Sequence, residues 1–101
     1  MIKHIVLWKL DDSYSSDEKL ALSLQIKEKL ESLVGKIDEL KSLEVGINSP
    51  EAPASNFDVC LDSTFDSIET LNAYQVHEEH VKVAGFIKSL NLSRSAIDYQ
   101  Y

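Results

Sequence analysis

Residues 2–10 read IKHIVLWKL, and this short segment decides the fold. Its side chains alternate between two faces, so that His4 and Trp8 share one face while Ile5 and Leu7 share the other. Both faces therefore carry large apolar groups. A strand exposed to water on one side would not place Ile5 and Leu7 there, so we expect each face to be covered.

The segment after this strand has the signals of a helix. Ser15 and Glu18 have the spacing of a capping box, in which each side chain bonds the other residue's backbone N–H. Apolar residues then recur at spacings of three and four as far as Ile37. Gly35 is expected to end the regular helix as a left-handed C-terminal cap.

Alternation and turn signals predict the elements of the second half. Strands are expected over residues 43–47, 57–65 and 96–101, with a proline-containing loop over 48–56. Asp66 is expected to cap the second helix. The apolar stripe of that helix changes register between Tyr74 and Val81, which favours a kink or break there over one straight helix.

The element order is strand, helix, strand, strand, helix, strand. It predicts a ferredoxin-like α+β fold, in which both helices cover one face of a four-stranded antiparallel sheet. The length of 101 residues is typical of one domain, which we place at residues 1–101. A single copy would leave Ile5 and Leu7 in water on the other face. We therefore expect a homodimer in which a second copy stacks its sheet on this face.

Charge and cysteine content limit the classes of function. The net charge of -7 and the pI of about 4.8 disfavour partners such as nucleic acid or an anionic membrane surface. Cys60 is the only cysteine and cannot form a disulfide within the chain, so the cytoplasm is the expected location. The apolar run of residues 2–10 is short and broken by Lys9, which indicates a strand and not a signal peptide.

Three histidines and a tyrosine are the candidate functional groups. His77 and His80 stand three residues apart shortly after Tyr74, and His4 lies on the first strand. An imidazole moves protons near neutral pH, and a phenol hydroxyl can donate a hydrogen bond to a ligand carbonyl. We expect His80 to act as base or acid, with Tyr74 as the donor to the carbonyl. A buried hydrogen bond between Tyr74 and His80 with a purely structural role is the alternative.

The remaining candidates also have two interpretations each. His4 either meets Tyr74 and His80 in one cavity or is a core histidine whose ring nitrogens are paired. Trp8 either lines a ligand pocket or packs in the core. If the helix breaks near His77, that ring caps backbone groups while His80 faces the pocket. Two histidines without a fixed third ligand do not define a metal site, so no metal is expected.

Two segments resemble the stress-responsive A/B barrel domain family, called Dabb. They are Ile2 to Leu10, and Thr64-Phe65-Asp66-Ser67 leading into Tyr74-Gln75-Val76-His77-Glu78-Glu79-His80-Val81. The resemblance covers nearly the whole chain, and it implies a ferredoxin-like protomer and a homodimer whose two sheets form a barrel. The family includes plant stress proteins, a plant polyketide cyclase and many bacterial members without an assigned activity.

The resemblance to the cyclase implies a pocket between sheet and helices, where a linear polyketide is closed by aldol condensation without a redox cofactor. The tyrosine and histidine of the cyclase match Tyr74 and His80, and its first-strand histidine matches His4. A third-strand histidine of the cyclase falls at Val59 here, and the frequent His-Pro of the family is His77-Glu78. The chain thus departs from the cyclase at one position and from the frequent family pattern at another, and these departures argue against polyketide cyclisation but do not affect the expected fold.

Some plant members of the family hold a magnesium ion on backbone carbonyls after the first helix. The matching positions are Val34, Ile37 and Leu40. Carbonyl ligation depends on backbone shape and leaves no side-chain pattern, so this ion does not enter the predicted site.

These observations predict a homodimer that binds a small apolar or carbonyl-bearing molecule between sheet and helices, without a cofactor. If the protein is catalytic, we expect proton transfer on a carbonyl compound by His80, with Tyr74 as the carbonyl anchor and His4 as a supporting polar group. The other predicted ligand contacts are Trp8, His77 and Val59. The alternatives are a stress-protective or structural dimer without a substrate and, by analogy of fold alone, a cofactor-free monooxygenase.

Overall fold

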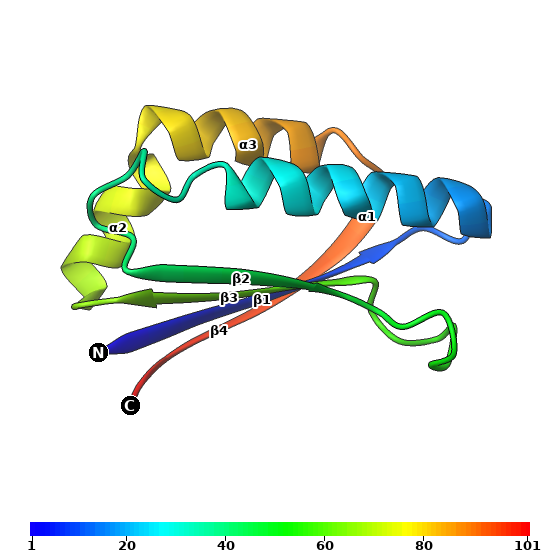
Figure 1. Ribbon diagram of the computed structural model, residues 1–101, viewed down its shortest axis with the longest axis horizontal. Coiled ribbons are helices and arrows are strands. Elements are labelled where there is room, and N and C mark those ends of the chain that lie inside the picture. Colours follow the sequence, from blue (N-terminus) through cyan, green and yellow to red (C-terminus); the bar gives the residue numbers. More distant parts are fainter.

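Strand β1 (Ile2–Leu10) lies inside the sheet, because it pairs along its length with two other strands. The computed structural model describes all 101 residues. The elements after β1 are α1 (Ser16–Glu31), β2 (Ser42–Ile47), β3 (Val59–Phe65), α2 (Ile68–Val76), α3 (Glu78–Lys88) and β4 (Leu92–Gln100). The sheet is antiparallel with the strand order β2-β3-β1-β4, and the helices cover one of its faces (Figure 1). This is the predicted ferredoxin-like fold, with the second helix divided in two.

The core lies between the helices and the covered face of the sheet. Residues of β1 alternate between buried and half-buried along the whole strand, as the sequence pattern predicted. Ile26 and Leu30 of α1 and Ile87 of α3 pack against this face and are at most 4% exposed. Each such side chain contributes about 1.5–3 kcal/mol of hydrophobic free energy relative to full exposure.

The opposite face of the sheet has no cover in a single chain (Figure 1). The β1–β4 register places Ile97 beside Ile5 and Tyr99 beside Lys3 on this face. Ile97 is 59% exposed and Tyr99 is 44% exposed, while Ile5 is half-buried. The uncovered apolar face expected from the sequence is therefore present, and β4 enlarges it.

The break in the second helical segment is confirmed. α2 ends at Val76, His77 has an extended backbone with φ -62° and ψ 138°, and α3 begins at Glu78. His77 is thus the C-terminal cap of one helix and the N-terminal cap of the next. This geometry turns α3 away from the axis of α2 and brings it over the sheet.

The first helix ends earlier than its apolar repeat indicated. α1 stops at Glu31, and the N–H of Ser32 bonds back to the Glu28 carbonyl. Gly35 has a φ of 86°, so the predicted left-handed position exists, but it belongs to the turn that follows the helix. The sequence signal was correct for the backbone conformation and wrong for the last helical residue.

Other boundaries also differ from the prediction: β3 begins at Val59 and not at residue 57, and β2 begins at Ser42 and not at residue 43. The cap of α2 is Ser67 and not Asp66, because the Ser67 hydroxyl accepts the Thr70 N–H at 3.2 Å while the Thr70 hydroxyl accepts the Ser67 N–H at 3.1 Å. The last strand begins at Leu92 instead of Ala96, because it pairs with the whole length of β1. Pairing with a neighbour, and not alternation alone, sets the length of this strand.

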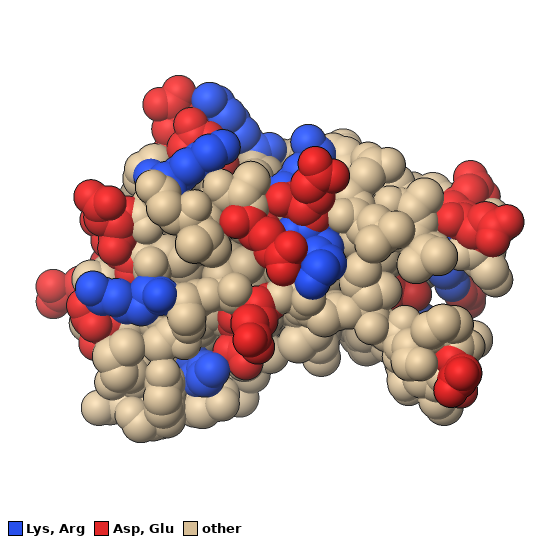
Figure 2. Space-filling view, in the orientation of Figure 1, with Lys and Arg blue, Asp and Glu red and all other residues tan.

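Acidic and basic side chains are interspersed on the face of the molecule shown in Figure 2, which carries no continuous basic surface. None of the helices is both long and apolar enough to cross a membrane.

Candidate functional site

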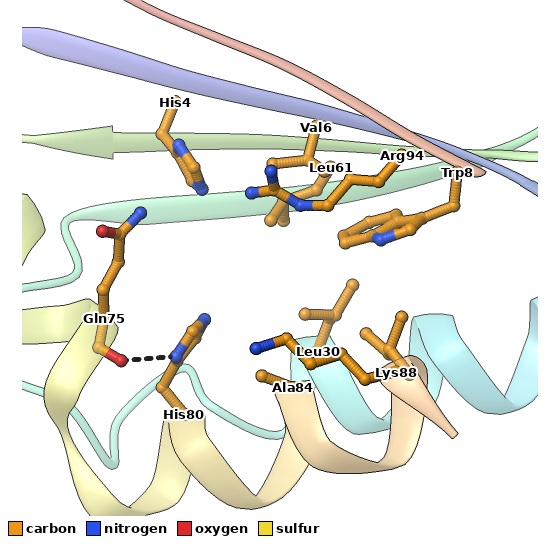
Figure 3. A pocket seen from close by; sticks show the side chains of 11 residues that line it. His4, Val6, Trp8, Leu30, Leu61, Gln75, His80, Ala84, Lys88 and Arg94 are labelled. Carbon is orange, nitrogen blue, oxygen red and sulfur yellow. Dashed lines mark hydrogen bonds between the residues drawn. The ribbon is translucent and has the colours of Figure 1, made fainter. Parts of the chain in front are cut away.

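A cavity of about 400 Å³ lies between the sheet and the helices α1 and α3 (Figure 3). Its apolar wall consists of Val6, Trp8, Leu30, Leu61, Ala84 and Ile87. Its polar groups are His4, Gln75, His80, Lys88 and Arg94. The hollow expected between the first strand and the second helical segment is therefore present, and it combines an apolar wall with nitrogen-bearing side chains.

His4 enters this cavity from the sheet. The β1–β4 register places Asp98 directly opposite His4, and the Asp98 carboxylate bonds His4 Nδ1. A carboxylate can only accept a hydrogen bond when ionised, so Nδ1 carries the proton and Nε2 of a neutral ring is the free acceptor. The side chain is nearly buried, and its ring points into the cavity in Figure 3. His4 is thus a histidine oriented by a carboxylate, a pairing that also holds the ring in proton-transfer sites.

His80 enters the same cavity from the opposite side, on α3. Its Nδ1 lies 2.9 Å from the Gln75 carbonyl oxygen, so this nitrogen donates and Nε2 is left toward the cavity (Figure 3). The helix break makes this bond possible. In an unbroken helix the Gln75 carbonyl would accept the Glu79 N–H, but that N–H donates to His77 Nδ1 at 3.1 Å.

The surroundings of His80 keep its ring neutral near pH 7. Burial lowers the pKa of His80, and the positive groups of Lys88 and Arg94 lower it further, as does His4. The hydrogen bond to the Gln75 carbonyl acts in the opposite direction and does not outweigh burial. A neutral imidazole with a free Nε2 is the form that accepts a proton from a ligand.

Tyr74 lies behind His80 and does not line the cavity. The centroid of its ring is 4.5 Å from that of His80 and 4.9 Å from that of Phe65, so it is packed between them. The side chain is 0% exposed, and its hydroxyl has no hydrogen-bond partner. Burial raises the pKa of Tyr74 to about 12, so the phenol stays protonated. The structure places Tyr74 against His80, as the spacing suggested, but joins them by ring packing without a hydrogen bond.

Of the other three predicted ligand contacts, only Trp8 lines the cavity. Trp8 forms part of its wall and is 5% exposed, so it is both core and lining. His77 caps α3 through its ring, which is the structural role considered for it, and it does not line the cavity. Val59 lies opposite Trp8 on β3, is 1% exposed and does not line the cavity either.

The carbonyls considered for a metal ion belong to the turns between α1 and β2. The Ile37 carbonyl accepts the Leu40 N–H at 3.2 Å, so one of the three candidate carbonyl ligands already takes part in a turn. No group of three or more His, Cys, Asp or Glu side chains is arranged to hold a metal ion.

Sequence reasoning missed four groups of this site. Arg94 precedes residue 96, where the sequence prediction began β4, and Asp98 lies within the predicted strand, but its partner on β1 was not evident from the sequence. Gln75 contributes its backbone carbonyl, which has no side-chain signal. Lys88 is the last residue of α3 and reads as an ordinary helix-terminal cation. Strand pairing across a separation of 94 residues joins His4 to Asp98, and local periodicity cannot show it.

The profile of the stress responsive A/B barrel domain matches residues 2–101. The chain belongs to the Dabb family.

Two curated proteins are similar to this Dabb chain, and the description of one of them names the same domain. A protein of Streptomyces coelicolor described as uncharacterised is 32% identical over 79% of each chain. The stress-response A/B barrel domain-containing protein DABB1 of Arabidopsis thaliana is 31% identical over 98% of this chain and 46% of its own length. The chain thus spans about half of that plant protein.

A crystal structure from Bacteroides fragilis shows the same fold as this Dabb chain. It has a TM-score of 0.89 and 35% identity, and the match covers 99% of this chain and 95% of the other. That protein is described as dimeric, with a ferredoxin-like fold and unknown function. Dimeric, ferredoxin-like neighbours are therefore established for this fold.

Proposed function

We propose that this Dabb chain forms a homodimer and binds a small, mainly apolar, carbonyl-bearing molecule in the cavity between sheet and helices. We further propose that His80 transfers a proton on that molecule without a cofactor. One observation carries the proposal: two imidazoles, each held at Nδ1, direct Nε2 into a single cavity with an apolar wall. A titratable group with a shifted pKa in such a cavity, as His80 has, is typical of reactive sites.

The proposed step is a proton transfer at the carbon next to the carbonyl. His80 Nε2 accepts the proton, and the electron pair of the broken C–H bond moves to the carbonyl oxygen as an enolate. The positive charges of Lys88 and Arg94 favour the negative charge that develops there. Return of the proton from His80 to carbon completes the cycle. His4, oriented by Asp98, is proposed as the second group that can accept or return a proton.

The geometry changes the role that we propose for Tyr74. Its hydroxyl is closed off from the cavity, so a direct bond to a ligand carbonyl would need a rearranged side chain. We propose instead that the ring supports His80 from behind. Because the phenol stays protonated, it places no negative charge beside the His80 imidazole.

Dimer formation is proposed through the uncovered face of the sheet. This face exposes Ile97 and Tyr99, and the similar Bacteroides protein is described as dimeric. We expect Ile97→Glu to yield a monomer in light scattering coupled to size exclusion, because a carboxylate would be buried between two sheets. The control is Val76→Glu, at a side chain that is 77% exposed on α2, and it should leave the dimer intact. A dimer that survives Ile97→Glu would contradict this interface.

Proton transfer is tested with 4-phenylbutan-2-one in D₂O, by following deuterium incorporation next to the carbonyl with mass spectrometry. The wild-type protein should accelerate the exchange, and His80→Gln should lower the protein-dependent rate by about 100-fold. The control is His77→Asn, which removes a histidine outside the cavity and keeps a capping residue. Equal rates for wild type and His80→Gln would refute the assigned role.

A non-catalytic role is the second candidate, and one observation favours it. Both His77 and His80 bond to backbone groups through their rings, as expected of histidines that stabilise a helix junction. This role, a structural dimer without a substrate, predicts neither specific binding of the ketone in the cavity nor protein-dependent exchange. The two candidates therefore differ in both the binding assay and the exchange assay.

A further inference from the structure

Two cations border the cavity from opposite layers of the fold. Arg94 belongs to β4 and lies opposite Trp8 in the register, on the face that bears the helices. Lys88 is the last residue of α3. In Figure 3 the guanidinium of Arg94 reaches along the sheet toward His4, and the amine of Lys88 extends toward His80. Both charged ends therefore face the same hollow.

Neither cation has an acidic partner. The chain carries 17 acidic and 10 basic residues, and Arg94 is its only arginine. Ion pairs within 4.0 Å involve Lys3, Lys19, Lys27, Lys41 and Lys82, but neither Lys88 nor Arg94. In a protein of net charge -7, two unpaired cations at one apolar cavity are a marked local excess of positive charge.

The acidic groups near the cavity do not neutralise this excess. Asp98 lies on β4, on the sheet face that bears the helices, and its carboxylate is bonded to His4. The remaining polar lining, His4, Gln75 and His80, contributes no negative side chain. Because the two cations repel each other and disfavour protonation of His80, an anion that enters the cavity would be stabilised by both of them.

We propose that the cavity selects a small organic acid, with one carboxylate held between Arg94 and Lys88 and an apolar body against Val6, Leu61 and Trp8. This inference rests on the proposed function, since it names the class of molecule that the same cavity binds. A guanidinium can bond a carboxylate through two parallel N–H groups, while an ammonium adds a point charge. The carboxylate would leave a carbonyl elsewhere in the molecule within reach of His80.

The site favours a monoanion over a phosphate ester. Lys88 marks the C-terminal end of α3, whose exposed carbonyls carry partial negative charge. The cavity is not faced by a glycine-rich loop, since the three glycines lie at Gly35, Gly46 and Gly85 and none of them lines it. A dianionic phosphate therefore lacks the backbone N–H groups that usually hold it.

The test uses 4-phenylbutyrate, its neutral amide 4-phenylbutanamide, which has the same shape, and the ketone 4-phenylbutan-2-one, which is of similar size. Trp8 is the only tryptophan and forms part of the wall, so its fluorescence reports occupancy of the cavity. We expect wild type to bind the acid about tenfold more tightly than the amide, because a charge-assisted hydrogen bond stabilises only the acid. Higher salt should weaken binding of the acid and not of the amide, since both cations are solvent-exposed.

Substitutions locate the effect at the two cations. Arg94→Gln and Lys88→Gln should each lower affinity for the acid by about tenfold and leave affinity for the amide unchanged. The control is Lys36→Gln, which removes the charge of an exposed lysine that forms no ion pair and does not line the cavity. Unchanged amide binding also shows that each variant is folded.

The outcomes separate this inference from the function on which it rests. Equal affinity of wild type for acid and amide, with binding of the ketone retained, would overturn the acid preference and leave the cavity as a ligand site. Loss of acid and amide binding to the same extent in Arg94→Gln would also overturn it. Failure of all three probes to change Trp8 fluorescence would overturn the proposed function together with this inference.

Discussion

Replacing Tyr74 by phenylalanine should stabilise the protein. The Tyr74 hydroxyl is completely buried and has no hydrogen-bond partner, and the ring is held between Phe65 and His80. Phenylalanine keeps this packing and removes only the oxygen. A buried polar group without a partner costs about 1–3 kcal/mol, so Tyr74→Phe should raise the free energy of unfolding by up to this amount.

The gain is large enough to measure in a chain of 101 residues. A change of 1 kcal/mol shifts the Tm of a domain of this size by about 4–8 °C. Urea titration and thermal melting, both at equal protein concentration because a dimer's stability depends on it, give the two readouts. Tyr14→Phe is the matched control, because the Tyr14 hydroxyl accepts the Asn91 N–H at 3.2 Å. That variant should lose about 0.5–1.5 kcal/mol.

Two results would refute this reasoning about Tyr74. A lower Tm for Tyr74→Phe would mean that the hydroxyl has a partner that stabilises the folded protein. Loss of binding of 4-phenylbutan-2-one in the variant would mean that the hydroxyl reaches the ligand, as the sequence pattern suggested. Retained binding together with a raised Tm would support ring packing as its role.

Three further predictions follow from single features of the structure. Burial lowers the pKa of His80 in the folded protein, so the contribution of the neutral ring to stability is complete above the unfolded pKa of about 6.5 and is lost as the pH falls through the lower, folded pKa. The urea midpoint should therefore fall less steeply between pH 8 and pH 5 in His80→Gln than in wild type. His77→Ala should lower the free energy of unfolding by about 0.5–2 kcal/mol in denaturant titrations and His77→Asn by less, since asparagine can also accept the Glu79 N–H. Gly35→Ala should cost about 1–2 kcal/mol in the same assay, because φ is 86° there, although a Cβ would meet no atom within 4 Å; an unchanged midpoint would show that this turn can relax.

The sheet and helices were predictable because their signals are local. Alternation in residues 2–10, the capping pair Ser15 and Glu18, and the register change after Tyr74 each act within a few residues. Errors arose where a neighbour decided the boundary. Pairing with β1 lengthened β4 at its beginning.

The candidate site was predictable in part. Placement of His4 and His80 at one cavity was one of the two alternatives that the strand pattern, the helix spacing and the family resemblance left open, and the structure decided for it. The orientation of both rings did not follow, since it depends on Asp98 across the sheet and on a carbonyl freed by the helix break. The closed environment of Tyr74 depends on how tightly its neighbours pack, which composition and spacing do not specify.

The amino-acid sequence by itself determined the order of elements, the apolar character of both faces of the first strand, and an acidic chain with three histidines. Only the tertiary structure decided that Arg94 and Lys88 border the same cavity as His4 and His80, and that Asp98 meets His4. The physical reason is the separation along the chain over which each interaction acts. Periodicity and capping act over one or two turns, whereas strand register joins residues almost a full chain length apart and so decides which charged side chains border the same cavity.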